Sequence, residues 1–255
     1  MDLESSAMPT WTETGHRPRW ERIGALATIR GVRLSGIRSA VTAARRFAAD
    51  VLYERRYGVR TSGRLILDQH DAESICYIAV KWRQLPRVLP PKAVTDQDVF
   101  IDLGSGMGRA VLEAAAIYPF ARVVGVELYP ELNDIARQNL ATTKRRLRCT
   151  NVDLICADLR EYELPDDVTV IFVNNSVRGS IFERMLDEFS ASMKRNPRRM
   201  RFVYSNPLEE EALLATGDWR KVRSVASRGA KWPYGFTCVY ERTPEKAESG
   251  TSEGR

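Results

Sequence analysis

The sequence has few of the residues that build metal centres, disulfide frameworks or histidine-based catalytic sites. It contains four cysteines, with no CxxC pair, and only two histidines, His16 and His70. Zinc sites and histidine triads need closely grouped side chains of these types, so neither is expected. No apolar run approaches the roughly 18 residues of a membrane-spanning helix. The beginning also lacks a charged-then-apolar leader, which predicts a cytoplasmic protein, or a nuclear one in a eukaryote, and not a secreted one.

The charge is unevenly distributed along the chain. The 255 residues carry a formal net charge of +6, and the first 60 contain 11 arginines and no lysine against six acidic residues. A basic segment on an otherwise neutral body attracts polyanions. Residues 17–60 therefore form either a solvated basic helix face or a surface for nucleic acid or an acidic partner.

The first part of the chain has a different pattern from the rest. Residues 1–19 lack periodicity and are expected to be a flexible leader. Residues 20–97 are expected to form a basic helical extension or lid, with a helix over 20–57 and a short helix over 82–89. In the long helix, one apolar stripe is formed by Leu34, Ile37, Val41, Ala44, Ala48 and Val51. Residues 243–255 have no large apolar side chain and are expected to be disordered.

From residue 98 onward, short apolar runs alternate with helical patterns. This alternation predicts an α/β, Rossmann-like domain over 98–242, with a seven-stranded, mostly parallel sheet that ends in an antiparallel hairpin. The expected strands are 99–101, 122–126, 152–156, 168–173, 201–204, 219–225 and 234–240. The expected helices are 107–118, 131–147, 181–193 and 208–214.

The strongest local signal is a glycine loop between the first strand and the first helix of this domain, DLGSGMGR over residues 102–109. Glycine permits close backbone approach to a ligand, and the following helix start offers unpaired N–H groups. A dinucleotide fingerprint requires a small residue where Arg109 stands, and the Gly-Lys-Ser/Thr of a phosphate loop is missing. Asp102 at the start of the loop disfavours a pyrophosphate and suits a ligand that bears an ammonium group.

A second acid supports a nucleoside ligand. Glu127 ends the next strand, 19 residues after Gly108, which is the spacing of a carboxylate that binds ribose hydroxyls. S-adenosylmethionine (SAM) has an ammonium group, a ribose and a cationic sulfonium. The alternative, a tight turn with two solvated acids, does not account for the agreement of loop, strand and second acid.

The segments VFIDLGSGMGR and VVGVEL resemble the first two motifs of class I SAM-dependent methyltransferases. With ICADLR and VIFVNN they resemble the histone-lysine methyltransferases that lack a SET domain, the disruptor-of-telomeric-silencing type. The resemblance implies SAM as cofactor, held by Asp102, Gly104, Ser105, Gly106, Gly108, Glu127, Leu128, Asp158, Leu159 and Asn174. It also places Asn174 and Asn175 beside the transferable methyl group, as the candidate catalytic residues.

Methyl transfer from a sulfonium requires a positioned, desolvated nucleophile more than a strong base. Asn174 can accept a hydrogen bond from an incoming amine, although two asparagines also suit a simple strand-to-helix turn. Trp232, Tyr234 and Phe236 either line an acceptor channel or form a packed strand face. Tyr77 and Trp82 either cover the cofactor or pack in the core.

The acceptor is less narrowly defined by the sequence than the donor. The two asparagines and the basic segment favour a lysine amine of a protein. A small-molecule N- or O-methyltransferase is the alternative. A non-catalytic module that binds SAM or nucleic acid is a third possibility, and no metal site is expected.

Overall fold

The computed structural model describes residues 34–63 and 77–244. The predicted leader 1–19, the first part of the predicted helix (20–33), His70 and residues 245–255 of the predicted tail lie outside these ranges. Within the described ranges, no helix combines the length and hydropathy needed to cross a bilayer.

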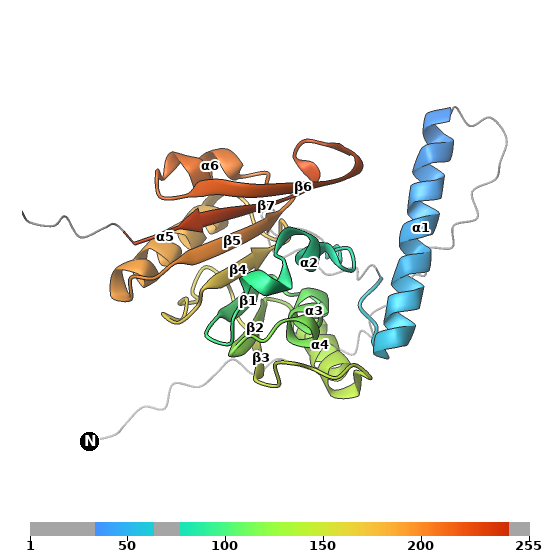
Figure 1. Cartoon of the computed structure of the whole chain (residues 1–255), viewed down its shortest axis with the longest axis horizontal. Helices are drawn as coiled ribbons and strands as arrows, with labels where there is room; N and C mark the ends of the chain where they lie inside the picture. The colour runs from blue at the N-terminus through green and yellow to red at the C-terminus, as the bar shows by residue number, and fades with distance from the viewer. Residues whose placement is uncertain (1–33, 64–76, 245–255) are drawn as a thin grey trace, which may run out of the picture.

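A seven-stranded sheet forms the centre of the molecule (Figure 1). Its strand order is β3-β2-β1-β4-β5-β7-β6, and β7 runs antiparallel to both of its neighbours. The strands are β1 (Val99–Leu103), β2 (Arg122–Glu127), β3 (Val152–Cys156), β4 (Val170–Val173), β5 (Met200–Ser205), β6 (Arg220–Lys231) and β7 (Tyr234–Arg242). The predicted Rossmann-like sheet with a C-terminal antiparallel hairpin is confirmed.

Helices cover both faces of the sheet, because its central strands are apolar on both sides. One core contains side chains of α5 and α6, including Phe182 and Leu213, and the other contains side chains of α2, α3 and α4, including Leu85 and Val111. The helices are α1 (Leu34–Tyr57), α2 (Gln84–Val88), the short 3-10 helix η1 (Pro91–Ala93), α3 (Arg109–Ile117), α4 (Pro130–Thr142), α5 (Gly179–Arg195) and α6 (Glu210–Ala215).

Two expected boundaries are wrong. The helix predicted over 131–147 ends at Thr142, because the chain then turns to meet the end of α1, where the Lys144 N–H donates to the carbonyl of Tyr57. The strand predicted over 219–225 continues to Lys231, because it pairs with β7, with register shifts along the way. Cross-strand hydrogen bonds, and not the apolar pattern, set this length.

The predicted apolar stripe of α1 is not a buried face in its described part. Val41 is 45% exposed, and Ala44 and Ala48 are also exposed. The contacts of the helix come from its second half, where Tyr53 stacks on Trp82 and the ring of Tyr57 packs against Trp82 at a tilt. Figure 1 shows the first half of α1 standing apart from the sheet. The helix is therefore held by aromatic and charged side chains near its end.

The direction of the strand order reverses between β1 and β4, which pair with each other and lead to helices on opposite faces. Loops that leave the carboxyl ends of two such strands separate and leave a crevice, which is where open α/β sheets bind ligands. The glycine loop follows β1, and the two asparagines follow β4.

Candidate functional site

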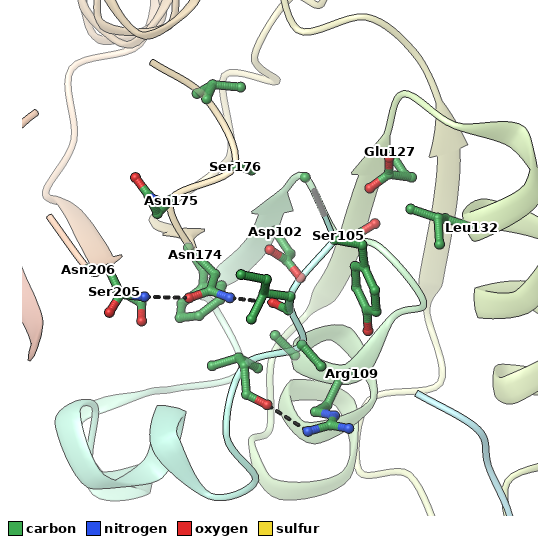
Figure 2. Close-up of a pocket in the computed structure, with 18 of the residues that line it drawn as sticks. Asp102, Ser105, Arg109, Glu127, Leu132, Asn174, Asn175, Ser176, Ser205 and Asn206 are labelled. Atoms are coloured by element: carbon green, nitrogen blue, oxygen red, sulfur yellow. Dashed lines mark hydrogen bonds between the residues drawn. The ribbon is translucent and has the colours of Figure 1, made fainter. Parts of the chain in front are cut away.

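A cavity of about 360 Å³ opens at this edge of the sheet. Figure 2 shows Asn174, Asn175 and Ser176 on one side of it, Glu127 on the other and Asp102 between them. Most of the residues singled out from the sequence line the cavity: Tyr77, Asp102, Gly104, Ser105, Glu127, Leu128, Asp158, Leu159, Asn174 and Asn175. Gly106 and Gly108 belong to the loop but do not line the cavity.

The glycine loop requires glycine for two physical reasons. Gly104, Gly106 and Gly108 all have positive φ, at 82°, 55° and 79°. A Cβ atom on Gly104 would lie 2.3 Å from the Cβ of Ser176, and one on Gly106 would lie 2.1 Å from the ring of Tyr77. The ring of Tyr77 thus packs directly on the loop, and a role as cover over the cofactor stays a prediction.

Asp102 is a buried acid with an unused hydrogen-bonding atom. Its side chain is 3% exposed, and its Oδ1 atom has no hydrogen-bond partner among the described residues. Burial, together with the nearby negative charge of Glu127, raises the pKa of Asp102 well above its ordinary value. Burying a carboxyl group without a hydrogen-bond partner is unfavourable in free energy. This arrangement therefore indicates a ligand that supplies a positive charge or a hydrogen-bond donor.

Glu127 holds the glycine loop in place. Its Oε2 atom accepts from the Gly106 N–H at 2.7 Å, and its Oε1 atom accepts from the Tyr129 N–H at 3.0 Å. Burial raises the pKa of Glu127, although these backbone donors act in the opposite direction. Each carboxylate oxygen has a second lone pair, so ribose hydroxyls can still be bound from the cavity side.

Asp158, after β3, lies at the same side of the cavity. It pairs with Arg160 at 2.6 Å, and this partner lowers the pKa of Asp158. Leu128 and Leu159 provide apolar surface beside it. The carboxylates of the cavity therefore come from β1, from β2 and from the segment after β3, as the spacing predicts.

Asn174 and Asn175 follow β4 but have different surroundings. The Asn174 amide donates to the Ile78 carbonyl at 2.9 Å, and its Oδ1 atom accepts from Asn206 at 3.3 Å (Figure 2). Asn206, which follows β5, also accepts from the Gly235 N–H at 2.7 Å. Asn175 has a φ of 52°, and its buried Oδ1 atom lacks a partner among the described residues.

The predicted aromatic residues fall into two groups. Tyr77 and Tyr234 line the cavity, and Tyr234 is 60% exposed at its rim. Trp82 instead packs between α1 and α3, and Trp232 packs against Phe236 with ring centroids 5.0 Å apart. Of the proposed lid and channel aromatics, only the two tyrosines lie at the cavity.

Sequence reasoning missed the role of Arg109. This side chain is 2% exposed and donates to Asp50 at 2.7 Å, to Thr61 Oγ1 at 2.8 Å and to the Val80 carbonyl at 2.8 Å. Thr61 in turn accepts, through its carbonyl, from the Tyr77 hydroxyl at 2.7 Å. The only signal in the sequence was an arginine at a position where nucleotide loops favour a small residue.

Comparison with known proteins identifies a family and a relative that match part of this chain. The family described as "Histone methylation protein DOT1" matches residues 66–212. A histone-lysine N-methyltransferase specific for H3 lysine-79, from Drosophila melanogaster, is 29% identical over 128 residues, which is 46% of this chain and 7% of that protein. The chain thus corresponds to a small part of that relative.

The solved structures that match this chain are less similar to it in sequence. An RNA methyltransferase from Salinibacter ruber in complex with S-adenosyl-L-homocysteine is 23% identical, with a TM-score of 0.47, over 68% of this chain and 97% of that chain. A SAM-dependent methyltransferase from Aquifex aeolicus is 13% identical, with a TM-score of 0.46, over 63% of this chain and 94% of that chain. Because the family match spans more than half of the sequence, this chain belongs to the histone methylation protein DOT1 family, as its motifs predicted.

Proposed function

We propose that this chain is a class I methyltransferase that uses SAM to methylate a lysine amine of a protein. The observation that carries this proposal is the buried Asp102 carboxylate, with one oxygen unpaired among the described residues, beside a glycine loop in the cavity. The ammonium group of SAM would supply the missing partner, since hydrogen bonds between charged groups are the strong ones. The Ser105 hydroxyl, which has no hydrogen-bond partner among the described residues, also lines the cavity and fits a polar ligand as well.

The remaining residues fit the rest of the cofactor. Glu127 would bind the ribose, and Asp158 with Leu128 and Leu159 would border the base. When bound, SAM supplies a methyl group on a sulfonium, which is already activated for displacement. Asn174 lines the cavity at the end of β4. Its amide oxygen accepts from Asn206, and a second lone pair on the same oxygen can accept a hydrogen bond from an amine and orient it.

A protein lysine is the acceptor that the family and the Drosophila relative favour, since the printed name of that relative is a histone-lysine methyltransferase. The sequence predicted the same acceptor from the two asparagines. The cytoplasm, or the nucleus in a eukaryotic source, is the compartment that goes with this proposal. Contact between residues 17–60 and nucleic acid stays a prediction.

Calorimetric titration with SAM tests the donor half of the proposal. The unaltered chain should bind, and Asp102→Ala should weaken binding by about 10- to 100-fold, because one charge-assisted contact contributes roughly 1.5–3 kcal/mol. Asp187→Ala, on the exposed face of α5, is the matched control and should bind like the unaltered chain. Absence of binding by the unaltered chain would refute the proposal.

Transfer of a labelled methyl group tests the acceptor half. The chain, labelled SAM and host extract should yield label on lysine residues of proteins, identified by mass spectrometry. Asn174→Ala should reduce the rate while SAM still binds. Label that appears in the small-molecule fraction instead would contradict the lysine acceptor.

A further inference from the structure

The charged side chains that line the cavity are unevenly distributed. Its carboxylates are Asp102, Glu127 and Asp158, and all three lie on the side formed by β1, β2 and the segment after β3. The other side is formed by residues 77–84, by the ends of β4 and β5, and by the β6–β7 hairpin. Arg46 and Lys81 line that side. Two other arginines also line the cavity, but each is paired with an acid, Arg109 with Asp50 and Arg160 with Asp158.

These two cations are held in fixed positions. The Arg46 guanidinium donates to the carbonyl of Ala79 at 2.8 Å, which brings α1 to the cavity mouth. The Lys81 ammonium donates to the Ser227 hydroxyl at 2.9 Å, across to the β6–β7 hairpin. Both partners are neutral, and neither cation forms an ion pair with another of the described residues.

Further positive charge surrounds Lys81. Burial and the charges of Arg46 and Arg87 lower the pKa of Lys81, and no carboxylate of the described residues acts on it in the opposite direction. The carbonyl of Arg87 accepts from the Arg223 guanidinium at 3.2 Å, which adds a fourth cation from β6. Arg46 and Lys81 line the cavity, and Arg87 lines a small neighbouring pocket together with Lys81. We call these three residues and Arg223, which lies next to Arg87, the cationic mouth.

This charge affects which substrate can enter. A lysine side chain is itself a cation in water, so the cationic mouth opposes its approach unless nearby anions accompany it. We propose that the acceptor lysine lies in an acidic stretch of a protein, whose flanking carboxylates pair with Arg46, Lys81 and Arg87 while the lysine enters toward Asn174. This inference rests on the proposed lysine acceptor and adds the substrate class.

One extended peptide can place its lysine in the cavity and its acidic neighbours at the cationic mouth. An extended chain advances about 3.3 Å per residue, so carboxylates one to three residues from the lysine reach a rim that surrounds the cavity. The exposed ring of Tyr234 lies on the same rim and offers an aromatic face to the ammonium group that passes it. The mouth therefore combines an aromatic surface for the lysine with cations for its acidic neighbours.

Peptide kinetics tests the inference. Three peptides of equal length carry one central lysine, flanked by aspartate and glutamate, by alanine and serine, or by arginine. At low salt, kcat/KM should fall about fivefold or more from the acidic to the neutral peptide, since each such pair contributes a modest gain. The fall should continue to the basic peptide, and added salt should reduce both differences.

Charge reversal identifies the residues responsible. Lys81→Glu and Arg87→Glu should remove or invert the preference for the acidic peptide, whereas Lys81→Arg keeps the charge and should keep the preference. Arg146→Glu, an exposed arginine outside the cavity lining, is the matched control and should leave it unchanged. SAM titration of each variant verifies that the protein is folded.

The outcomes separate this inference from the proposed function. Equal kcat/KM for acidic and neutral peptides would overturn the inference and leave the methyltransferase intact. Label found only on small molecules would refute the lysine acceptor, and the inference with it. If duplex DNA were needed for activity and Lys81→Glu abolished DNA binding, the mouth would bind phosphates, and the acidic-protein inference would be wrong.

Discussion

Three carboxyl groups of this protein are buried, and their burial affects ligand binding at the cavity and the stability of the fold. Asp102, Glu113 and Glu127 are each 6% exposed or less, and burial raises the pKa of all three. Asp102 and Glu127 line the cavity, so a bound ligand can offset the unfavourable free energy of burying their carboxylates. Glu113 lies on α3, away from the cavity lining, and accepts from the Arg83 N–H while its second oxygen has no partner among the described residues. A ligand in the cavity therefore cannot offset the free energy of burying Glu113, which lowers the stability of the fold directly.

Glu113 is expected to make stability depend on pH. Burial raises its pKa from 4.5 to about 7, so the native state holds a proton that the unfolded chain releases. The contribution of Glu113 to stability should be greatest below pH 4.5, fall as the pH rises from 4.5 to 7, and then level off, with a loss of up to roughly 3 kcal/mol. Urea unfolding between pH 4.5 and 8 should show a smaller slope for Glu113→Gln. The exposed Glu183→Gln is the control, and an unchanged slope in Glu113→Gln would contradict the assignment.

Gly106→Ala is expected to damage the cofactor loop specifically. The new Cβ would lie 2.1 Å from the ring of Tyr77, at a φ of 55° that disfavours any side chain. Tyr77 must then move, and SAM affinity should fall by about tenfold or more, since strain of roughly 1–3 kcal/mol is introduced at the site. Gly217→Ala, with a φ of 75° and no atom within 4 Å of the added Cβ, carries similar backbone strain in open space. Equal SAM affinity in both variants, measured by calorimetry, would contradict the role of this contact.

Among the elements, α1 depends on its charged second half for its position. Asp50 and Glu54 lie 2.7 and 3.5 Å from the guanidinium of Arg109, which begins α3. The same guanidinium lies 4.8 Å from the ring centroid of Trp82. One buried arginine thus joins α1, the segment before α2 and the helix that follows the glycine loop.

Arg109→Met is expected to release α1 while the sheet stays folded. Methionine keeps most of the apolar volume but removes every donor, and breaking a buried ion pair costs about 3–5 kcal/mol. Hydrogen exchange in residues 48–57 should accelerate, with little change in β1 and β4. Arg55→Met, on the exposed side of the same helix, should leave exchange as it was. Full protection of α1 in Arg109→Met would show that other contacts hold the helix.

The bounds of strands that consist of one apolar run could be predicted from the sequence. The length of a strand that depends on its pairing partner, and the position of a helix that depends on ion pairs, could not. β2 lies within one residue of the range expected, 122–126, because residues 123–126 form a short buried apolar run between polar residues. The extent of β6 depends on β7, and the contacts of α1 depend on Arg109, more than 50 residues further along. Asn206 was missed for the same reason: only the fold brings it beside Asn174.

At the scale of the whole molecule, the cavity is completed by the part of the chain that precedes the sheet. Residues 77–84 supply one wall, and Leu85, Val88 and Val94 are buried in the same core as α3. The predicted division into an extension over 20–97 and a domain over 98–242 stays a proposal. The packing suggests that the part indispensable to the fold begins within α1, near Asp50.

Two truncated chains test where that part begins. A chain that starts at residue 44 keeps Asp50, Tyr53, Glu54 and Tyr57, and should match the full chain in melting temperature and, within about twofold, in SAM affinity.

A chain that starts at residue 58 leaves Arg109 without its acidic partners and uncovers Trp82. A loss of about 3 kcal/mol should lower its melting temperature by roughly 5–10 °C. SAM affinity should fall as well, because Thr61, which bonds both Arg109 and Tyr77, loses its support from Glu54. If the chain that starts at residue 58 kept the melting temperature and the SAM affinity of the full chain, α1 would not stabilise the fold, and the position of Tyr77 on the glycine loop would not depend on α1.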